Sequence, residues 1–543
     1  MSSPNRFRTI ALAAGMLAAS VQAQAQAQVP GPSADPACFP EAAAIPGWGP
    51  AMRRTVVVHD PEVFRQADFS LARTLGAIVR SNGLEDSGGE RVALLQSMVR
   101  SFARDTFVNG EGGLVTVADP RPNEAALDPA AMLQSTGKDG FRPVAVFNRL
   151  DLAPDDWSNC GEHRIVYAKG DGSDRSDRMT LIFEAKLRNP GGRKHACRPI
   201  AQFWDGLSAP GLTSSDLARR LAAFFYAGDL DGDGSSDLPG GGAVIQALHL
   251  GQEVGQVRGN LFMANPGDHP WQLREWRVAS GADNAPVFVA TTVKENPHPA
   301  LYEPDGPATP AEQVRQRQDF LGALIGQAAA NLTELDRAAA PVDRGRLLAE
   351  LGAGFPGRFD SFVSISHDIP AAVDDPVRRG TGNSMLLRSL EARLAGLSRP
   401  DRCHITPEQL LNRAGAMSCG GCHQFSVGKE IAPQVRWPAA LGRFVHVDEK
   451  GDLSPALEDH FLPERRRGLT RYLAETAIPL ASTAPVATAA GSSPVSLLLR
   501  RLPEATTRRD RLELLRGAEE AAAAERRREA ARPGAFTPFR RSH

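Results

Sequence analysis

The chain has 543 residues, with 62 Lys and Arg against 63 Asp and Glu and a formal net charge of −1. This balance gives no electrostatic footprint for nucleic acid, which we therefore exclude as a partner. Beyond the N-terminus no apolar stretch reaches the roughly 20 residues of a membrane-spanning helix, so we expect no integral membrane anchor in the mature protein. The length allows two or three domains.

Residues 1–25 predict a secretory signal peptide. Arg6 and Arg8 form a basic region, residues 10–21 are apolar, and residues 23–25 (Ala-Gln-Ala) match a cleavage site. The apolar run is too short for a retained anchor, and no cysteine at the cleavage point would take a lipid. We therefore expect a periplasmic or secreted protein.

Residues 26–399 predict an α+β domain of unknown role, with a mainly antiparallel sheet and flanking helices. Helical spacing of apolar residues predicts helices over residues 69–80, 91–107, 214–227, 310–335 and 384–397. Segments rich in β-branched and aromatic residues predict strands over residues 143–150, 164–168, 179–187, 259–264, 271–278 and 287–293.

The chain contains six cysteines. In an exported protein, cysteines without another chemical role tend to pair as disulfides. Four qualify: Cys38, Cys160, Cys197 and Cys403. The sequence does not determine the pairing, but we favour Cys160 with Cys197 because the predicted strands between them could bring their ends together.

An acidic loop follows the predicted helix at residues 214–227. Its spacing, D-x-D-x-D-G-x-x-D, turns alternate oxygens inward around calcium. The candidate ligands are Asp229, Asp231, Asp233, Ser235 and Asp237. The twelfth position is Gly240 where a bidentate Glu is expected, so a complete EF-hand is not predicted. The alternative is a surface turn with solvated carboxylates.

Residues 419–423 have the sequence Cys-Gly-Gly-Cys-His, the C-x-x-C-H arrangement of covalent haem c attachment. Cys419 and Cys422 would add to the haem vinyl groups, and His423 would ligate the iron as the proximal axial ligand. Two alternatives stay open. One is a structural disulfide between the two cysteines, and the other is a zinc site that recruits Cys403 or His404.

The segment 400–476 around this motif resembles a small mono-haem class I cytochrome c. Residues 406–409 (Thr-Pro-Glu-Gln) match a capped start of the family's N-terminal helix, and residues 463–474 match its closing helix. The resemblance implies an all-α haem module. It also implies that the carbonyl of Pro433 accepts a hydrogen bond from the proximal imidazole.

The resemblance breaks down at the sixth iron ligand. That family usually supplies a downstream Met, and this chain has no Met after Met417. We favour His446, which lies between apolar residues, as the distal axial ligand, although a half-buried structural histidine is the alternative. His460 follows two acidic residues and is expected to be solvated. Met385, His367 or an open position are further options.

The whole chain also resembles uncharacterised exported bacterial proteins with a C-terminal C-x-x-C-H module. Residues 419–426, 437–438 and 444–447 carry the resemblance in the module, and residues 148–152 and 160–164 carry it in the large domain. This resemblance implies no activity. Residues 477–543 are predicted to be a linker and a tail rich in Ala, Arg and Glu.

Polar residues around the predicted strands form a weaker signal. They mark either a functional cleft or structural ion pairs and turn caps. The residues are Asn148, Arg149, Asp151, Glu162, His163 and Glu184.

The predicted function is electron transfer by one haem c, with a redox partner protein or a small-molecule electron donor or acceptor. An alternative is a haem-dependent oxidoreductase of the peroxidase or oxidase type, in which the α+β domain binds substrate. A calcium-stabilised binding module is a third hypothesis.

Overall fold

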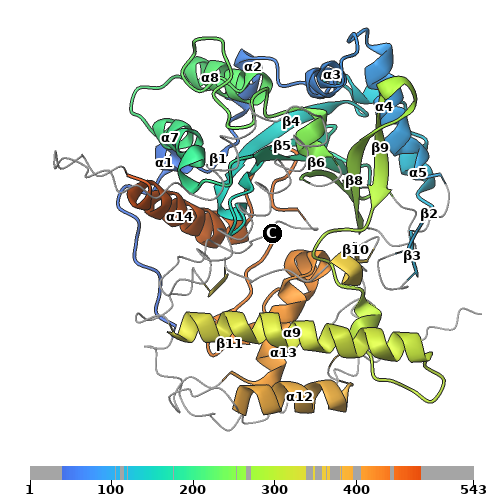
Figure 1. Cartoon of the computed structure of the whole chain (residues 1–543). Coiled ribbons are helices and arrows are strands. Elements are labelled where there is room, and N and C mark those ends of the chain that lie inside the picture. Colours follow the sequence, from blue (N-terminus) through green and yellow to red (C-terminus); the bar gives the residue numbers. More distant parts are fainter. Residues whose placement is uncertain are drawn as a thin grey trace, which may run out of the picture.

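The computed structural model describes residues 39–477, apart from 104–105, 110–114, 119, 175, 252–253, 264–270, 338–346, 349–356, 362–363, 367–379, 381, 396–404 and 441–444. The predicted signal peptide, Cys38, Cys403, His404, His367 and the C-terminal tail lie outside the described residues. Figure 1 shows one central sheet with helices on both sides.

The central sheet has eight strands in the order β1-β4-β5-β6-β7-β8-β10, and β9 also pairs with β8. All these pairs are antiparallel. The strands are β1 (Val57–Val58), β4 (Phe141–Arg149), β5 (Asn159–Lys169), β6 (Met179–Arg188), β7 (Gln256–Leu261), β8 (Trp271–Ser280), β9 (Pro286–Thr291) and β10 (Ser364–Ser366). Both the predicted α+β class and the six predicted strands are confirmed.

One face of the sheet is apolar. Because side chains alternate between the two faces along a strand, Ile165, Tyr167, Leu181 and Phe183 all point to this face. It packs under α3 (Leu71–Ser81), α4 (Gly89–Arg100), α7 (Arg198–Gly206) and α8 (Ser214–Ala227), whose buried residues belong to the same core cluster. In Figure 1, α3 and α8 lie on this side of the sheet.

The opposite face of the sheet contacts the C-terminal part of the chain. Val144, Phe147 and Val166 share a second core cluster with Leu410, Ala414, Cys422 and Trp437. Three helices lie on this side in Figure 1: α9 (Ala311–Arg337), α12 (Ser384–Ala395) and α13 (Pro407–Ala416). The segment that carries the C-x-x-C-H motif is thus packed directly on the sheet.

The predicted module at residues 400–476 contains α13 and α14 (Leu462–Glu475), as expected. It also contains a two-stranded sheet of β11 (Glu430–Ala432) and β12 (Val435–Arg436), joined by a turn in which Gln434 has a φ of 63°. The predicted all-α character of this segment is therefore not confirmed.

The remaining elements are short. The α-helices are α1 (Pro50–Arg53), α2 (Pro61–Gln66), α5 (Pro122–Ala125) and α6 (Pro129–Met132). A second small sheet pairs β2 (Thr106–Asn109) with β3 (Val115–Ala118). The helix predicted over residues 91–107 is therefore wrong at its end, because α4 stops at Arg100 and Thr106 begins a strand.

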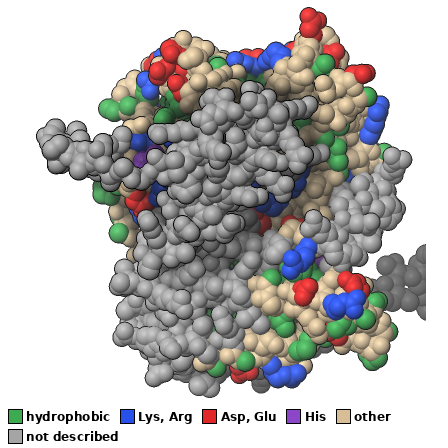
Figure 2. Space-filling model, in the orientation of Figure 1, with side chains coloured by type: hydrophobic (Ala, Val, Ile, Leu, Met, Phe, Trp, Pro, Cys, Tyr) green, Lys and Arg blue, Asp and Glu red, His purple; other side chains and the backbone are tan. Residues whose placement is uncertain are grey.

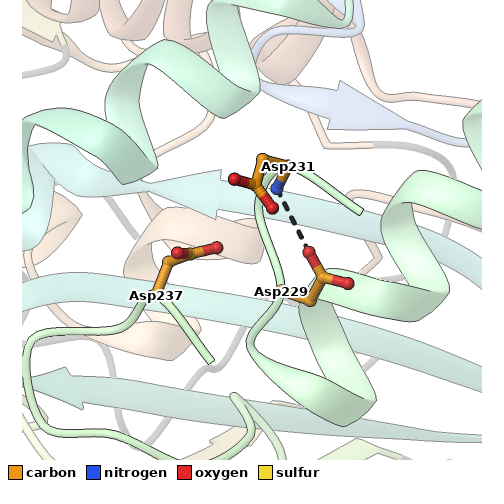
Figure 3. Close-up of side chains that lie close together, drawn as sticks. All are labelled: Asp229, Asp231 and Asp237. Carbon is orange, nitrogen blue, oxygen red and sulfur yellow. Dashed lines mark hydrogen bonds between the residues drawn. The ribbon is translucent and has the colours of Figure 1, made fainter. Parts of the chain in front are cut away.

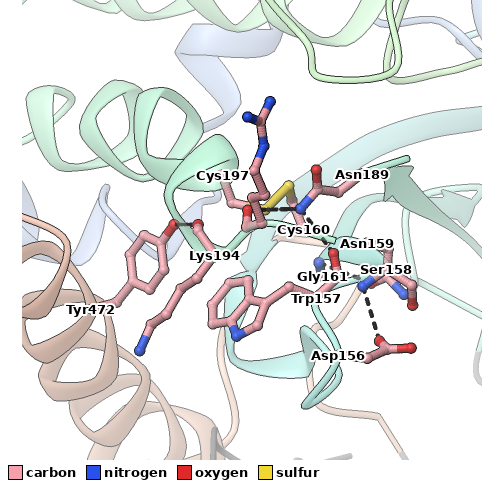
Figure 4. The surroundings of a disulfide bond; sticks show 11 residues. Asp156, Trp157, Ser158, Asn159, Cys160, Gly161, Asn189, Lys194, Cys197 and Tyr472 are labelled. Carbon is pink, nitrogen blue, oxygen red and sulfur yellow. Dashed lines mark hydrogen bonds between the residues drawn. A yellow bond between two sulfur atoms is a disulfide. The ribbon is translucent and has the colours of Figure 1, made fainter. Parts of the chain in front are cut away.

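The disulfide predicted between Cys160 and Cys197 is confirmed. Cys160 lies near the start of β5, and Cys197 closes the short helical turn η2 (Lys194–Cys197). Figure 4 shows the bond beside Asn189, whose side-chain amide donates to the carbonyl of Trp157 at 2.8 Å. Disulfides are typical of proteins from oxidising compartments.

No helix among the described residues has the length and apolarity to cross a bilayer. On the face drawn in Figure 2, the visible acidic and basic side chains are intermingled, in keeping with the near-zero net charge.

Candidate haem attachment site

The C-x-x-C-H motif follows directly from α13. The Thr406 side chain accepts from the Gln409 backbone N–H at 3.1 Å, and the Gln409 side chain accepts from the Thr406 N–H at 3.0 Å. This capping box, with Pro407 at the first helical position, confirms the predicted helix start. After α13 ends at Ala416, the chain makes one further helical turn at Cys419 and continues as the π-helical turn η7 (Gly421–Phe425).

Residues from outside the module hold this turn in place. The Asn296 side-chain oxygen accepts from the Cys419 N–H at 3.3 Å, and the Ser364 hydroxyl accepts from the Gly420 N–H at 2.9 Å. These contacts satisfy backbone donors that a helix start leaves free. Gly421 is required because a Cβ there would lie 1.8 Å from the carbonyl oxygen of Gly415.

Both motif thiols are buried and unbridged. Burial raises the pKa of Cys419 to about 12 and also raises the pKa of Cys422, so both groups are neutral thiols at physiological pH. The structure therefore does not contain the alternative disulfide between them.

His423, the histidine of the C-x-x-C-H motif, faces His446. Their ring centroids are 4.5 Å apart, and the Trp271 ring lies 5.6 Å from His423 on the sheet side. His446 Nδ1 is 2.8 Å from the Ser454 hydroxyl, and its Nε2 is 3.6 Å from the Cys422 sulfur. The favoured distal residue is thus brought next to the motif from 23 positions along the chain.

A cavity of about 90 Å³ lies between the motif and the polar part of the sheet. Cys419, His423 and His446 line its module side. Its other lining residues are Phe147, Arg164, Val166, Thr180, Ile182, Glu184, Arg258, Asn260, Leu273, Val445, Val447, Leu457 and Arg465. The cavity is therefore enclosed by the motif segment on one side and by the sheet of the large domain on the other.

The sheet wall of this cavity carries a buried ion-pair network. Arg164 contacts Glu162 at 2.6 Å and Glu184 at 3.2 Å. Arg258 contacts Glu275 at 3.1 Å and Glu184 at 3.6 Å. Each carboxylate thus has an arginine partner, as buried charges require.

The pKa values of two carboxyl groups in this network are shifted in opposite directions. Although burial favours the neutral acid, Arg164 and Lys186 hold the pKa of Glu162 well below its usual value. Burial raises the pKa of Glu275 despite its contact with Arg258. A charged group bound in the cavity would lie next to ionised side chains that the sheet holds at fixed positions.

The polar residues that the sequence places around the predicted strands lie on both faces of the sheet. Glu162 and Glu184 belong to the cavity network, and Arg149 donates three hydrogen bonds of 2.9, 3.0 and 3.1 Å to Asp151. His163 instead points into the apolar core, where it accepts from Trp204 Nε1 at 3.2 Å. Asn148 caps local backbone, accepting from the Leu150 N–H at 3.0 Å.

The other candidate haem residues lie in different places. Pro433 stands in the turn between β11 and β12, and its contact with His423 stays a prediction. His460 lines a separate surface pocket with Trp48 and Arg467, away from the motif cavity. Met385 is 41% exposed on α12, as expected for a surface side chain rather than an iron ligand.

The predicted calcium loop brings three of its acidic residues together. One carboxylate oxygen each from Asp229, Asp231 and Asp237 lies within 4.8 Å of the others. Figure 3 shows these three side chains. Asp233 instead accepts from the Ser235 N–H and hydroxyl at 2.8 and 2.6 Å. The Asp229 carboxylate accepts from three backbone N–H groups of the loop, at Asp231, Gly232 and Gly234.

This is the one grouping of three metal-ligand side chains found among the described residues. Cys419, Cys422, His423 and His446 do not converge tightly enough to form such a group. Their arrangement therefore does not support the zinc alternative, at least without Cys403 or His404, which lie outside the described residues.

The donor set has the residue chemistry of covalent haem attachment, with two unbridged thiols three residues apart followed by an imidazole. Cys419 and His423 line the cavity, whereas Cys422 is not among its lining residues. The cavity volume is below the roughly 300–1,000 Å³ of typical ligand pockets. The cavity in its present form is therefore too small to enclose a porphyrin.

Sequence patterns did not identify several residues at this site. Arg258, Arg465 and Trp271 line or border the cavity, and Asn296 and Ser364 hold the motif. None belongs to a motif. Arg258 directly precedes a predicted strand, and Arg465 lies in a run of charged residues in a predicted helix. Both patterns are common on solvated surfaces.

Comparisons with protein families, curated proteins and solved structures found no match to this chain. The resemblances carried by the motif region therefore stay predictions.

Proposed function

We propose that this chain is a c-type haem protein that transfers electrons. Cys419 and Cys422 would attach the haem, and His423 would be its proximal axial ligand. The observation that carries the proposal is the pair of buried, unbridged thiols followed by an imidazole, of which Cys419 and His423 line a cavity. The other two described cysteines, Cys160 and Cys197, form a disulfide, whereas Cys419 and Cys422 do not.

The attachment chemistry balances without an oxidant. Each thiol S–H adds across a vinyl C=C bond, so that sulfur bonds to one carbon and hydrogen to the other. Cys419 and Cys422 supply these thiols from one helical turn, which sets their separation. The bound haem would supply an iron that alternates between ferrous and ferric states.

His446 is the proposed distal ligand. The Ser454 hydroxyl fixes its Nδ1, which leaves Nε2 available on the side of the motif. His423 and His446, whose ring centroids are 4.5 Å apart, would hold the haem iron between them.

We also propose that the protein is exported to the periplasm or secreted. The N-terminal signal pattern and the Cys160–Cys197 disulfide both support this location. Electrons would then be exchanged with a redox partner protein or a small-molecule donor or acceptor of that compartment.

A second candidate function is a haem-dependent oxidoreductase of the peroxidase or oxidase type. It is favoured by the polar sheet wall, because Arg164, Glu184 and Arg258 face the same cavity as His423. In this case the α+β domain would bind a polar substrate beside an iron with an open position.

Absorption spectra of the full chain, matured with the c-type haem machinery, test these proposals. We expect a covalent haem by the pyridine haemochrome assay and its complete loss in a Cys419→Ser, Cys422→Ser double variant. A low-spin spectrum that becomes high-spin in His446→Ala would support electron transfer with two axial histidines. His460→Ala is the matched control and should leave the spectrum unchanged.

Two outcomes would contradict the leading proposal. Wild-type protein without covalent haem would remove the haem function altogether. A high-spin spectrum in the wild type, unchanged in His446→Ala, would instead favour the oxidoreductase.

A further inference from the structure

The cavity beside the motif has the size of a small ion. Its volume of about 90 Å³ corresponds to roughly three water molecules, so a ligand of about three or four non-hydrogen atoms fits. Apolar side chains make up much of the lining: Phe147, Val166, Ile182, Leu273, Val445, Val447 and Leu457. An apolar cavity with a few polar groups is typical of ligand sites.

Thr180 and Asn260 present hydrogen-bond donors on the sheet wall of this cavity. They are direct partners on the neighbouring strands β6 and β7, so their side chains lie side by side on one face. Each is 3% exposed and lines the cavity. The indole N–H of Trp271 donates to Asn260 Oδ1 at 3.2 Å, which fixes the amide and leaves its NH₂ group for another partner.

These donors are not used within the protein. The Thr180 hydroxyl and the Asn260 NH₂ group have no hydrogen-bond partner among the residues that the structure describes. Buried donors cost free energy unless they are bonded. The two side chains therefore favour a ligand that accepts hydrogen bonds.

Arg258 adds a cation to the same patch. It precedes Asn260 by two residues, so both side chains lie on the same face of β7. Its Nε donates to Glu275 at 3.1 Å, and its Nη2 donates to the Lys294 carbonyl at 3.3 Å. Within the described part of the chain, its Nη1 has no hydrogen-bond partner.

The nearby acidic groups do not occupy these donors. Glu184, the one carboxylate among the described lining residues, accepts from Gln256 Nε2 at 2.5 Å and pairs with Arg164 at 3.2 Å. Burial raises the pKa of Glu275, which favours its neutral acid and leaves the charge of Arg258 less compensated. Hydroxyl, amide and guanidinium donors together match a small, negatively charged group of oxygen acceptors.

We propose that Thr180, Asn260 and Arg258 form a binding site for a small planar oxyanion, of the size of nitrate or formate. The inference does not rest on the haem proposal, because all three donors belong to the sheet of the large domain. The bound anion would lie in the cavity that His423 and His446 also line.

The experiment uses sodium nitrate as the probe, because nitrate is a planar oxyanion and a poor ligand for haem iron. Isothermal titration calorimetry measures its binding to the full chain, prepared with and without the c-type haem machinery. Sodium gluconate at equal ionic strength is the control salt, since gluconate is too large for the cavity.

We expect the wild type to bind one nitrate. Thr180→Val keeps the shape of the side chain but removes the hydroxyl, and it should weaken binding at least about tenfold through the loss of one hydrogen bond to an anion. Asn260→Leu should have a similar effect, and Thr180→Val decides the question if that variant does not fold. Thr291→Val, on β9 and outside the cavity lining, is the matched control and should keep the wild-type affinity.

Nitrate that does not bind to the wild type, or that binds equally to Thr180→Val, would overturn the inference. Binding that requires haem and is lost in His446→Ala would assign the anion to the iron and would overturn it as well. The haemochrome assay on the same preparations tests the haem function separately. Wild-type chain that binds nitrate but carries no covalent haem after maturation would support the oxyanion site while the proposed haem function fails.

Discussion

The two faces of the central sheet differ in the kind of residue they bury. Along β5, Ile165 and Tyr167 point into an apolar core, whereas Glu162 and Arg164 on the alternate positions join an ion-pair network. Both faces are buried, so solvent exposure does not explain the difference. Buried charge is costly unless it is paired, and an apolar replacement of such pairs is often at least as stable.

This difference indicates that the two faces of the sheet have different roles. The helix-covered face, which packs on α3, α4, α7 and α8, supplies stability through apolar burial. The motif-covered face, which borders Cys419 and His423, holds polar groups at fixed positions beside a proposed cofactor. Substitutions on the first face should change stability with little effect on the haem, and substitutions on the second should do the reverse.

The largest expected effect on stability is on the helix-covered face. Phe183→Ala removes a fully buried ring that contacts Tyr167 and Phe288, and it should lower the free energy of unfolding by about 3–5 kcal/mol. Urea denaturation of the purified protein measures this loss. The haem spectrum should not change.

Thr180→Val is the matched control for this prediction. Thr180 lies on the same strand but lines the motif cavity. We expect a smaller loss of stability and a detectable change in the haem spectrum. If Phe183→Ala alters the spectrum more than Thr180→Val does, the two faces are not separate in function.

The disulfide gives the next largest effect. Cys160 and Cys197 are 37 residues apart, and removing the bond in a Cys160→Ala, Cys197→Ala variant should cost about 2–4 kcal/mol. Both cysteines belong to the apolar core of the helix-covered face. Removing Cys160 and Cys197 should therefore lower stability in the denaturation assay without changing the haem content. Removing Cys419 and Cys422 should change the haem content measured by the haemochrome assay. Loss of haem in the disulfide variant would break the comparison.

Much of the sheet could be predicted from the sequence, because its strands are apolar segments bounded by turn residues. The strand 271–278 and the helix 214–227 match β8 and α8 closely. Helix α7 and strand β10 were missed: α7 is short, and the three residues of β10 show no alternation of their own. The helix predicted over residues 91–107 from apolar spacing alone is too long, because α4 ends at Arg100.

The candidate site could be predicted only where a motif marks it. The thiols and His423 follow from their spacing, and His446 from its apolar neighbours. The sheet wall could not be predicted, because Arg258 meets Cys419 only through long-range packing of β7 against the C-terminal segment. The charged run Glu464 to Arg467 was predicted only as part of a helix; in the structure Glu464 and Arg465 are buried, while Arg466 and Arg467 pair nearer the surface.

A buried histidine makes the helix-covered face sensitive to acid. Burial lowers the pKa of His163 to about 3, although Glu162 and Asp151 oppose the shift and His249 adds to it. The unfolded chain binds this proton near pH 6.5 and the folded chain does not. Stability should therefore be full above about pH 6.5 and fall by up to about 1.4 kcal/mol per pH unit towards pH 3.

His163→Phe tests the origin of this dependence. Urea denaturation at pH 7.5 and pH 5 should show a smaller difference in unfolding free energy for the variant than for the wild type. His195→Phe, at a residue in η2 that is not buried, is the control and should keep the wild-type difference. An equal pH dependence in all three proteins would assign the acid sensitivity to other groups.

The smallest expected effect concerns the acidic loop at the C-terminal end of α8, on the helix-covered side. If Asp229, Asp231 and Asp237 bind calcium as their spacing predicts, calcium at ten times its Kd should add about 1.4 kcal/mol to the free energy of unfolding. Thermal denaturation with calcium or with EDTA measures this gain, which should vanish in Asp229→Asn but persist in Asp171→Asn. The haem spectrum should not respond, because the loop belongs to the face that provides stability. A calcium-dependent midpoint potential would contradict that separation and would connect the loop to the cavity across the sheet.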